Sequence, residues 1–141
     1  MEMEIINDNE FKKLKIYKQH QFTNRYDHSI AVAKMAEYFA GLIHADKEKA
    51  YRAGLLHDFF FYDWHGDKLP ENHVFYHPKV AAENAKKFSL SEEELDAIRS
   101  HMWPLGPLPK SKIAWCVTIA DKICALEEAC YIPKLKYIFS N

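Results

Sequence analysis

The residues of this chain best suited to chemistry are histidines and aspartates at positions that helical periodicity would bury. His28 leads the apolar stripe of one predicted helix, His57 ends the stripe of the next, and Asp58 follows His57 directly. Asp121 lies on the apolar face of a later predicted helix, and no lysine or arginine supplies an ion pair on these stripes. A buried carboxylate is costly unless it is paired or binds a metal. We therefore interpret these four residues as ligands of a divalent cation.

The ligand types narrow the choice of metal and leave the number of ions open. Imidazole and carboxylate ligands without thiolate favour Mn, Fe, Ni, Co or a catalytic Zn over a structural zinc site. His77 and His101 lie at the boundaries of predicted elements. If they join the site, Asp58 can bridge two ions, and such a pair clamps the attacking and leaving oxygens of a phosphoryl group. Each histidine alone is more often a core or surface residue, so only the whole set indicates a metal site.

Helical periodicity dominates the elements that must position these residues. Helices are predicted after Asp8, from a cap at Thr23 or Asn24 to about residue 45, and after Asp46. Further helices are predicted from Pro78, from the capping box of Ser91 and Glu94, and from Ser111 to a stop at Pro133. The pattern fails over residues 59–76, and a loop of that length in a compact domain is usually functional. The prediction is an all-α bundle of five to seven helices.

Length and composition predict one domain over residues 1–141, with a core at 23–130 on which the N-terminal helix and the C-terminal tail pack. The net charge of −1 gives no support for a nucleic-acid partner or an anionic membrane. Three cysteines without a C-x-x-C motif, and the absence of a signal-like or membrane-length apolar run, predict a cytoplasmic protein with reduced thiols.

Three segments, read in order, resemble the HD-domain metal-dependent phosphohydrolase superfamily. They are TNRYDHS at 23–29, AGLLHD at 53–58 and IADK at 119–122, with HP at 77–78 and AIRSH at 97–101 between them. The resemblance implies an all-α fold that hydrolyses phosphate esters, often of nucleotides. It also implies a first metal on His28, His57, Asp58 and Asp121, and a second on Asp58, His77 and His101. The chain departs from many members because Phe59-Phe60-Phe61 follows the doublet in place of Ile-Gly-Lys.

The expected reaction is attack on phosphorus by a water that the metal acidifies. Asp58 would orient this water or bridge the ions, and Asp63 would donate a proton or support the site. Arg25 and Lys122 would bind a small phosphate substrate, although both also fit as structural or surface charges. Two alternatives stay open: a di-iron oxygenase of the same superfamily, and a non-catalytic module that senses nucleotide or metal. The sequence predicts neither the oligomeric state nor the identity of the substrate.

Overall fold

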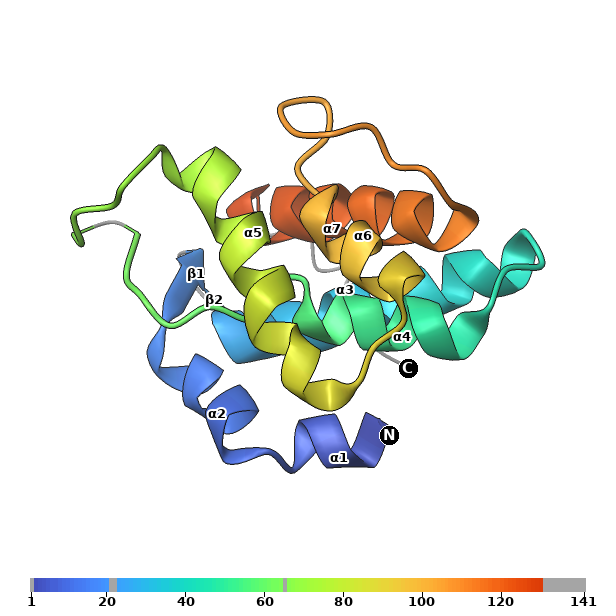
Figure 1. Ribbon diagram of the computed structural model, residues 1–141, viewed down its shortest axis with the longest axis horizontal. Coiled ribbons are helices and arrows are strands. Elements are labelled where there is room, and N and C mark those ends of the chain that lie inside the picture. Colours follow the sequence, from blue (N-terminus) through green and yellow to red (C-terminus); the bar gives the residue numbers. More distant parts are fainter. Residues whose placement is uncertain (1, 21–22, 65, 131–141) are drawn as a thin grey trace.

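A computed structural model describes residues 2–20, 23–64 and 66–130 of the chain, and these residues are mostly helical (Figure 1). The elements in chain order are α1 (Glu2–Ile6), α2 (Asn9–Lys12), η1 (Lys13–Ile16), β1 (Lys18–His20), β2 (Thr23–Asn24), α3 (Arg25–Leu42), α4 (Lys47–Leu56), α5 (His73–Ala85), η2 (Lys86–Phe88), α6 (Glu92–Arg99) and α7 (Lys112–Cys130). The prediction of a helical bundle is confirmed.

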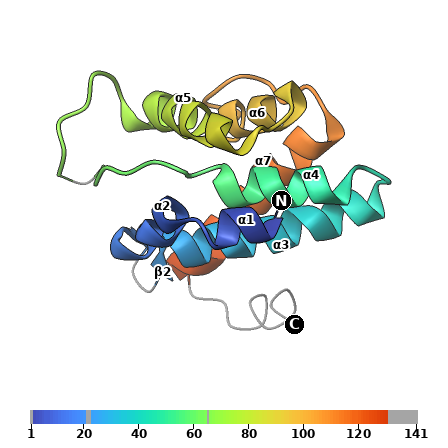
Figure 2. The same cartoon turned by 60° about the horizontal axis from the view of Figure 1, so that its bottom comes forward.

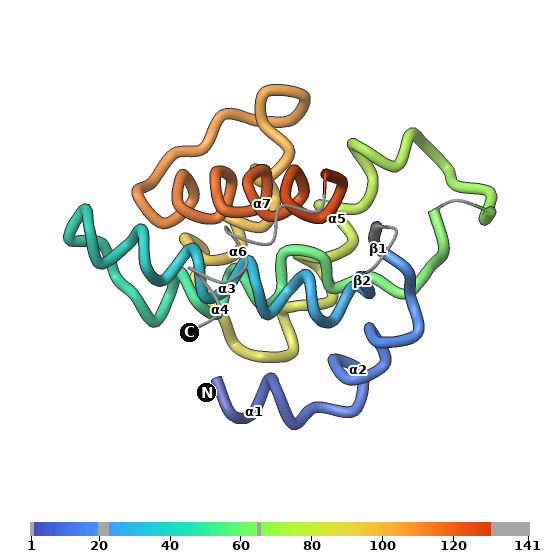
Figure 3. The backbone as a smooth tube through the Cα atoms, turned by 180° about the vertical axis from the view of Figure 1, so that it is seen from behind, coloured from blue at the N-terminus to red at the C-terminus, as the bar shows by residue number. Residues whose placement is uncertain are grey.

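The helices are stacked in layers around α4. Figure 2 shows α5 and α6 on one side of α4, and α1, α2 and α3 on the other. Helix α3 packs against α4 and α7, and α7 also contacts α6. Seen from behind, α3 and α7 run side by side across the molecule (Figure 3). Every long helix therefore has a face toward the centre.

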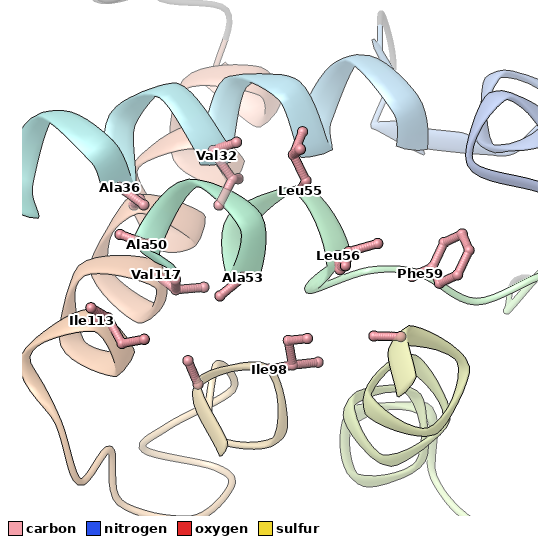
Figure 4. Close-up of a cluster of buried hydrophobic side chains, with 14 of the residues drawn as sticks. Val32, Ala36, Ala50, Ala53, Leu55, Leu56, Phe59, Ile98, Ile113 and Val117 are labelled. Atoms are coloured by element: carbon pink, nitrogen blue, oxygen red, sulfur yellow. The ribbon is translucent and has the colours of Figure 1, made fainter. Parts of the chain in front are cut away.

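Small and branched apolar side chains fill this centre. The residues labelled in Figure 4 include Val32 and Ala36 of α3, Ala50 and Ala53 of α4, Ile98 of α6, and Ile113 and Val117 of α7. Gly54 allows α4 to lie unusually close to α3, since a Cβ at this position would be 2.7 Å from the Cα of Ala33. Ala50, Ala53 and Gly54 share one face of this helix in the sequence pattern, which predicts the close approach of a neighbouring helix, and this prediction is confirmed.

Polar caps set the starts of the site-bearing helices. Asn24 accepts the backbone N–H of Asp27 at α3, and Asp46 accepts that of Lys49 at α4. Ser91 and Glu94 form both bonds of a capping box at α6. These caps satisfy N–H groups that have no partner within the helix. The predicted starts of these three helices are confirmed.

Two details of the predicted elements are wrong. Pro78 lies inside α5, which begins at His73 with Asn72 as its cap. The N-terminal preference of proline was outweighed by a capping side chain more than a turn earlier. Leu42 continues the apolar stripe that His28 begins, which predicts a buried side chain, but it is exposed at the end of α3. The short β1–β2 pair, in which Lys18 lies opposite Asn24, was not predicted.

No helix among the described residues is long and apolar enough to cross a membrane. The predicted stop at Pro133 and the packing of the C-terminal tail concern residues outside the described ranges.

Candidate metal centre

Five elements bring buried histidine and aspartate side chains to one place in the core. His28 comes from α3, His57 and Asp58 from the end of α4, and His77 from α5. His101 follows α6 and Asp121 lies on α7. The four histidines and Asp58 are buried, and the side chain of Asp121 is 13% exposed. The structure thus brings all six predicted metal ligands together.

One group of these residues, which we name the first half, comprises His28, His57 and Asp121 with the Oδ2 atom of Asp58. His28 Nε2 lies 3.2 Å from His57 Nε2 and 2.9 Å from Asp121 Oδ1. His57 Nε2 lies 3.2 Å from the same Asp121 oxygen. Asp58 Oδ2 is 3.7 Å from His28 Nε2 and 3.4 Å from His57 Nε2. Four potential ligand atoms therefore surround one point.

The other group, the second half, comprises His77 and His101 with the Oδ1 atom of Asp58. The Nε2 atoms of the two histidines are 3.0 Å apart. Each of them lies 3.5 Å from Asp58 Oδ1. Asp58 therefore presents one carboxylate oxygen to each half, as a ligand that bridges two ions does.

The Nδ1 atom of each ring is held by an acceptor, which aims Nε2 at the centre. His57 donates to Gly54 O, His77 to His73 O and His101 to Ile98 O, each at 2.7 Å. His28 Nδ1 donates to the carboxylate of Glu128, also at 2.7 Å. Contacts of this kind fix the tautomer and orientation of metal-binding histidines.

The charges of the first half are coupled. Burial lowers the pKa of His28, but hydrogen bonds and charge from Asp121 and Glu128 outweigh burial and hold this pKa well above 6.5. Burial raises the pKa of Asp58, but the positive charge of His57, a hydrogen bond from His101 and the charges of His77 and His101 hold it well below 3.8. The carboxylates around His28 therefore favour a positive charge there, which a proton supplies in the metal-free chain and a divalent ion would have to replace.

The second half contains a histidine whose pKa is lowered and not raised. Burial lowers the pKa of His77 to about 3, with the charge of His101 acting in the same direction and Asp58 opposing it. Protonation of His77 is therefore disfavoured, and its Nε2 offers a lone pair at neutral pH.

The donor set fits one or two divalent ions. With each Nδ1 acting as a donor, a ring that gives up its Nε2 proton presents a lone pair to the centre, and the Nε2 atoms lie 3.0 and 3.2 Å apart in the two halves, an arrangement that a shared cation suits. Metal–ligand bonds of about 2.0–2.2 Å place neighbouring ligand atoms about 2.9–3.6 Å apart, close to the separations in both halves. No lysine or arginine among the described residues pairs with Asp58 or Asp121.

Comparison with known proteins identifies the family, because the HD domain model matches residues 25–126, a range that contains all six predicted ligands. The chain belongs to the HD domain family. HD domains are typically metal-dependent phosphohydrolases, and the buried His/Asp cluster of this one is consistent with metal binding.

This HD domain is similar to parts of larger proteins named Ribonuclease Y. It is 34% identical over 125 residues to that of Mycoplasma capricolum, over 85% of this chain and 23% of the relative. It is 34% identical over 105 residues to that of Lawsonia intracellularis, over 74% and 19%. It is 36% identical over 102 residues to that of Acetivibrio thermocellus, over 72% and 18%. The similarity therefore covers less than a quarter of each of these relatives.

The other predicted site residues of the HD domain are more dispersed. The amine of Lys122 donates to His101 O at 3.1 Å, so this cation lies beside the second half. Asp63 is exposed in the loop after α4, where its backbone N–H donates to Asp67. The roles predicted for Asp63 and Lys122 stay predictions.

Arg25 is fully buried beneath the same loop. Its guanidinium donates to Phe60 O at 2.7 Å and to Tyr62 O at 3.1 Å, and it lies over the rings of Tyr17 and Phe60. These contacts favour a role in holding residues 60–62 over the predicted binding of substrate.

The loop of the HD domain also carries a row of stacked rings. The ring of His73 stacks on that of His77, with centroids 4.2 Å apart. The ring of Trp64 also stacks on His73, with centroids 4.7 Å apart. Tyr62 Oη lies 3.1 Å from His73 Nδ1. The row packs the loop against the helix that carries His77.

Two residues of the site were missed from the sequence. Glu128 lies seven positions after Asp121 on α7, and this helical spacing was a signal that could have found it. Gln19 donates from Nε2 to Asp58 Oδ2 at 3.1 Å. It lies on the unpredicted strand β1, so no periodic pattern marked it.

Proposed function

We propose that this HD domain is a metal-dependent phosphohydrolase that cleaves a phosphate ester, with nucleotides among its candidate substrates. The observation that carries the proposal is the placement of Asp58, with Oδ2 toward His28 and His57 and Oδ1 toward His77 and His101. Divalent ions held by such a site acidify water and neutralise the charge of phosphoryl oxygens. The proposed ions are Fe, Mn, Ni, Co or Zn.

The chain's own residues would orient the reacting groups. Gln19 Nε2 fixes the Asp58 carboxylate, and Gln19 Oε1 is buried without a hydrogen-bond partner among the described residues. This oxygen can accept a hydrogen bond from a water or hydroxyl at the site. Lys122 supplies a positive charge for a phosphate, and Asp63 in the loop is the proposed proton donor.

The test is hydrolysis by metal-free protein resupplied with each ion in turn. We would use p-nitrophenyl phosphate, bis(p-nitrophenyl) phosphate, a panel of nucleotides and an oligoribonucleotide. The mono- and diester probes separate phosphomonoesterase from phosphodiesterase chemistry. The RNA probe is included because the relatives are named as ribonucleases, although the near-neutral charge of the chain predicts no nucleic-acid partner.

The controls are substitutions in the cluster and on the surface. His57→Ala and Asp58→Ala should abolish hydrolysis, whereas Glu93→Gln, at an exposed carboxylate on α6, should leave it unchanged. Activity that survives both cluster substitutions would refute the proposal. Oxygen consumption without phosphate release would favour the di-iron oxygenase, and metal or nucleotide binding without any turnover would favour the sensing module.

A further inference from the structure

The two halves of the metal centre differ in negative charge. The first half has the carboxylate of Asp121 in addition to one oxygen of Asp58. The second half has only the other oxygen of Asp58, together with two histidines. A divalent cation is therefore attracted more strongly to the first half.

The groups behind the ligands increase this difference. In the first half, the Nδ1–H of His28 donates to the charged Glu128, whose side chain is 10% exposed. In the second half, the Nδ1–H groups of His77 and His101 donate to neutral backbone carbonyls. A carboxylate behind an imidazole makes it a more basic ligand than a carbonyl does.

Helix α7 also carries a lysine close to the metal centre. Lys122 donates its amine to the backbone carbonyl of His101, a ligand of the second half. Burial lowers the pKa of Lys122 and the charge of Asp121, in the first half, opposes this, so Lys122 does not act on one half alone. The difference between the halves is set by Asp121 and Glu128 of α7.

We propose that metal ions load in a fixed order, the first half binding tightly and the second half weakly and exchangeably. Glu128 is the positioning residue that makes His28 a strong ligand. The inference rests on the proposed function, because both require divalent ions at these residues. It adds which half fills first and which charged residues set the order.

The experiment is a calorimetric titration of the metal-free full chain with Mn²⁺ in the absence of substrate. The number of ions bound at saturation is measured as well. Co²⁺ is titrated in parallel, because its visible absorption reports the ligand geometry of each equivalent. We expect two steps separated by at least tenfold in affinity. His77→Ala should remove the weaker step, and Asp121→Asn should remove the tighter one.

The charged residues behind the ligands give the sharper test. Glu128→Gln should weaken the tighter step by about 10- to 100-fold and leave the weaker step unchanged. Glu127→Gln, at the neighbouring carboxylate on α7, should change neither step. The melting temperature of each metal-free variant separates these effects from a loss of folding.

Several results would overturn the inference: two equal steps, a single ion at every concentration, or an equal effect of Glu128→Gln on both steps. Removal of the tighter step by His77→Ala would also overturn it, because the assignment of the halves would then be reversed. Ordered binding of two ions without hydrolysis of any probe would refute the phosphohydrolase proposal and leave the loading order supported.

Discussion

At the scale of single residues, the site depends on how Asp58 is held. Its Oδ2 accepts from Gln19 and faces the first half, while Oδ1 faces the second half. A carboxylate that gives one oxygen to each of two ions must keep a fixed torsion angle about its Cβ–Cγ bond. Gln19 is the described residue outside the ligand set that fixes this rotation.

Replacement of Gln19 by leucine should weaken Mn²⁺ binding by about tenfold, because the Asp58 carboxylate loses the donor that orients it. Calorimetric titration measures the effect. Lys18→Ala, at an exposed position of the same strand, is the matched control and should bind as the unmodified chain does. Equal affinities for Gln19→Leu and the unmodified chain would show that the contact does not orient Asp58.

The same residues predict how stability depends on pH without metal. The pKa of His28 is raised above 6.5 in the folded chain, so its contribution is present below that pH and is lost as the pH rises through the folded value. The pKa of Asp58 is lowered, so its contribution is present above 3.8 and is lost as the pH falls through the folded value.

Metal-free protein should therefore be most stable near pH 6.5. Above this pH it loses the contribution of His28, and below it the unfolded chain protonates His77 while the folded chain, with the pKa of His77 lowered to about 3, does not. Metal-saturated protein should show the opposite trend over that upper range, since protons compete with the ion for the histidines. Urea unfolding at a series of pH values, with Mn²⁺ or with a chelator, measures both. Parallel profiles would contradict the assignment of the cluster as a cation site.

At the scale of elements, the doublet His57-Asp58 is placed by the contact of α4 with α3 and by the loop that follows. Gly54 sets the distance between the helices and its carbonyl holds the ring of His57. Arg25, at the first position of α3, ties down the residues just after Asp58. Both contacts link helix packing to ligand geometry.

Gly54→Ala should destabilise the fold by about 1–3 kcal/mol, because its Cβ would overlap the backbone of α3. Gly41→Ala is the matched control on α3, since its Cβ would lie 3.6 Å from the flexible side chain of Lys47. That change should be neutral or slightly stabilising, because alanine favours the helix. Chemical denaturation compares the two, and equal stabilities would contradict the close approach.

Arg25→Met should lower the free energy of unfolding by about 1–3 kcal/mol for each buried carbonyl left without a donor. Metal affinity should fall with it, because the segment after Asp58 is released. Denaturant unfolding, metal titration and the KM for a phosphate ester distinguish the two roles of Arg25. A raised KM with unchanged stability and metal affinity would favour substrate binding over the structural role.

At the scale of the whole molecule, the metal centre joins residues far apart in the chain. His28 and Asp121 are 93 positions apart, and the ligands come from five elements that also share one core. The site is therefore complete only when the helices have packed. Binding at the site and folding of the domain are linked.

A divalent ion at 100 times its dissociation constant should stabilise the fold by about 2.7 kcal/mol. For a chain of this size, the melting temperature should rise by roughly 5–10 °C. Differential scanning fluorimetry with Mn²⁺ and then excess chelator measures the rise and its reversal. Asp121→Asn should reduce the rise, whereas a rise unchanged by this substitution would place the stabilising ion elsewhere.

The sequence alone was sufficient to predict the helical fold and the six candidate ligands. Caps at Asn24, Asp46 and Ser91 are local signals, and a polar residue on an apolar helical stripe is visible without coordinates. The start of α5 was wrong because Asn72 and Pro78 give competing local signals.

Only the tertiary structure decided what the sequence left open. The division of Asp58 between two halves, the burial of Arg25 and the contacts of Gln19 and Glu128 all join residues from different elements. Periodicity shows which face of a helix is buried, but not which groups of other helices meet it. Which groups come into contact depends on the distance and the crossing angle between helices. The distance of α4 from α3 at Gly54, for example, is set by packing between these two elements.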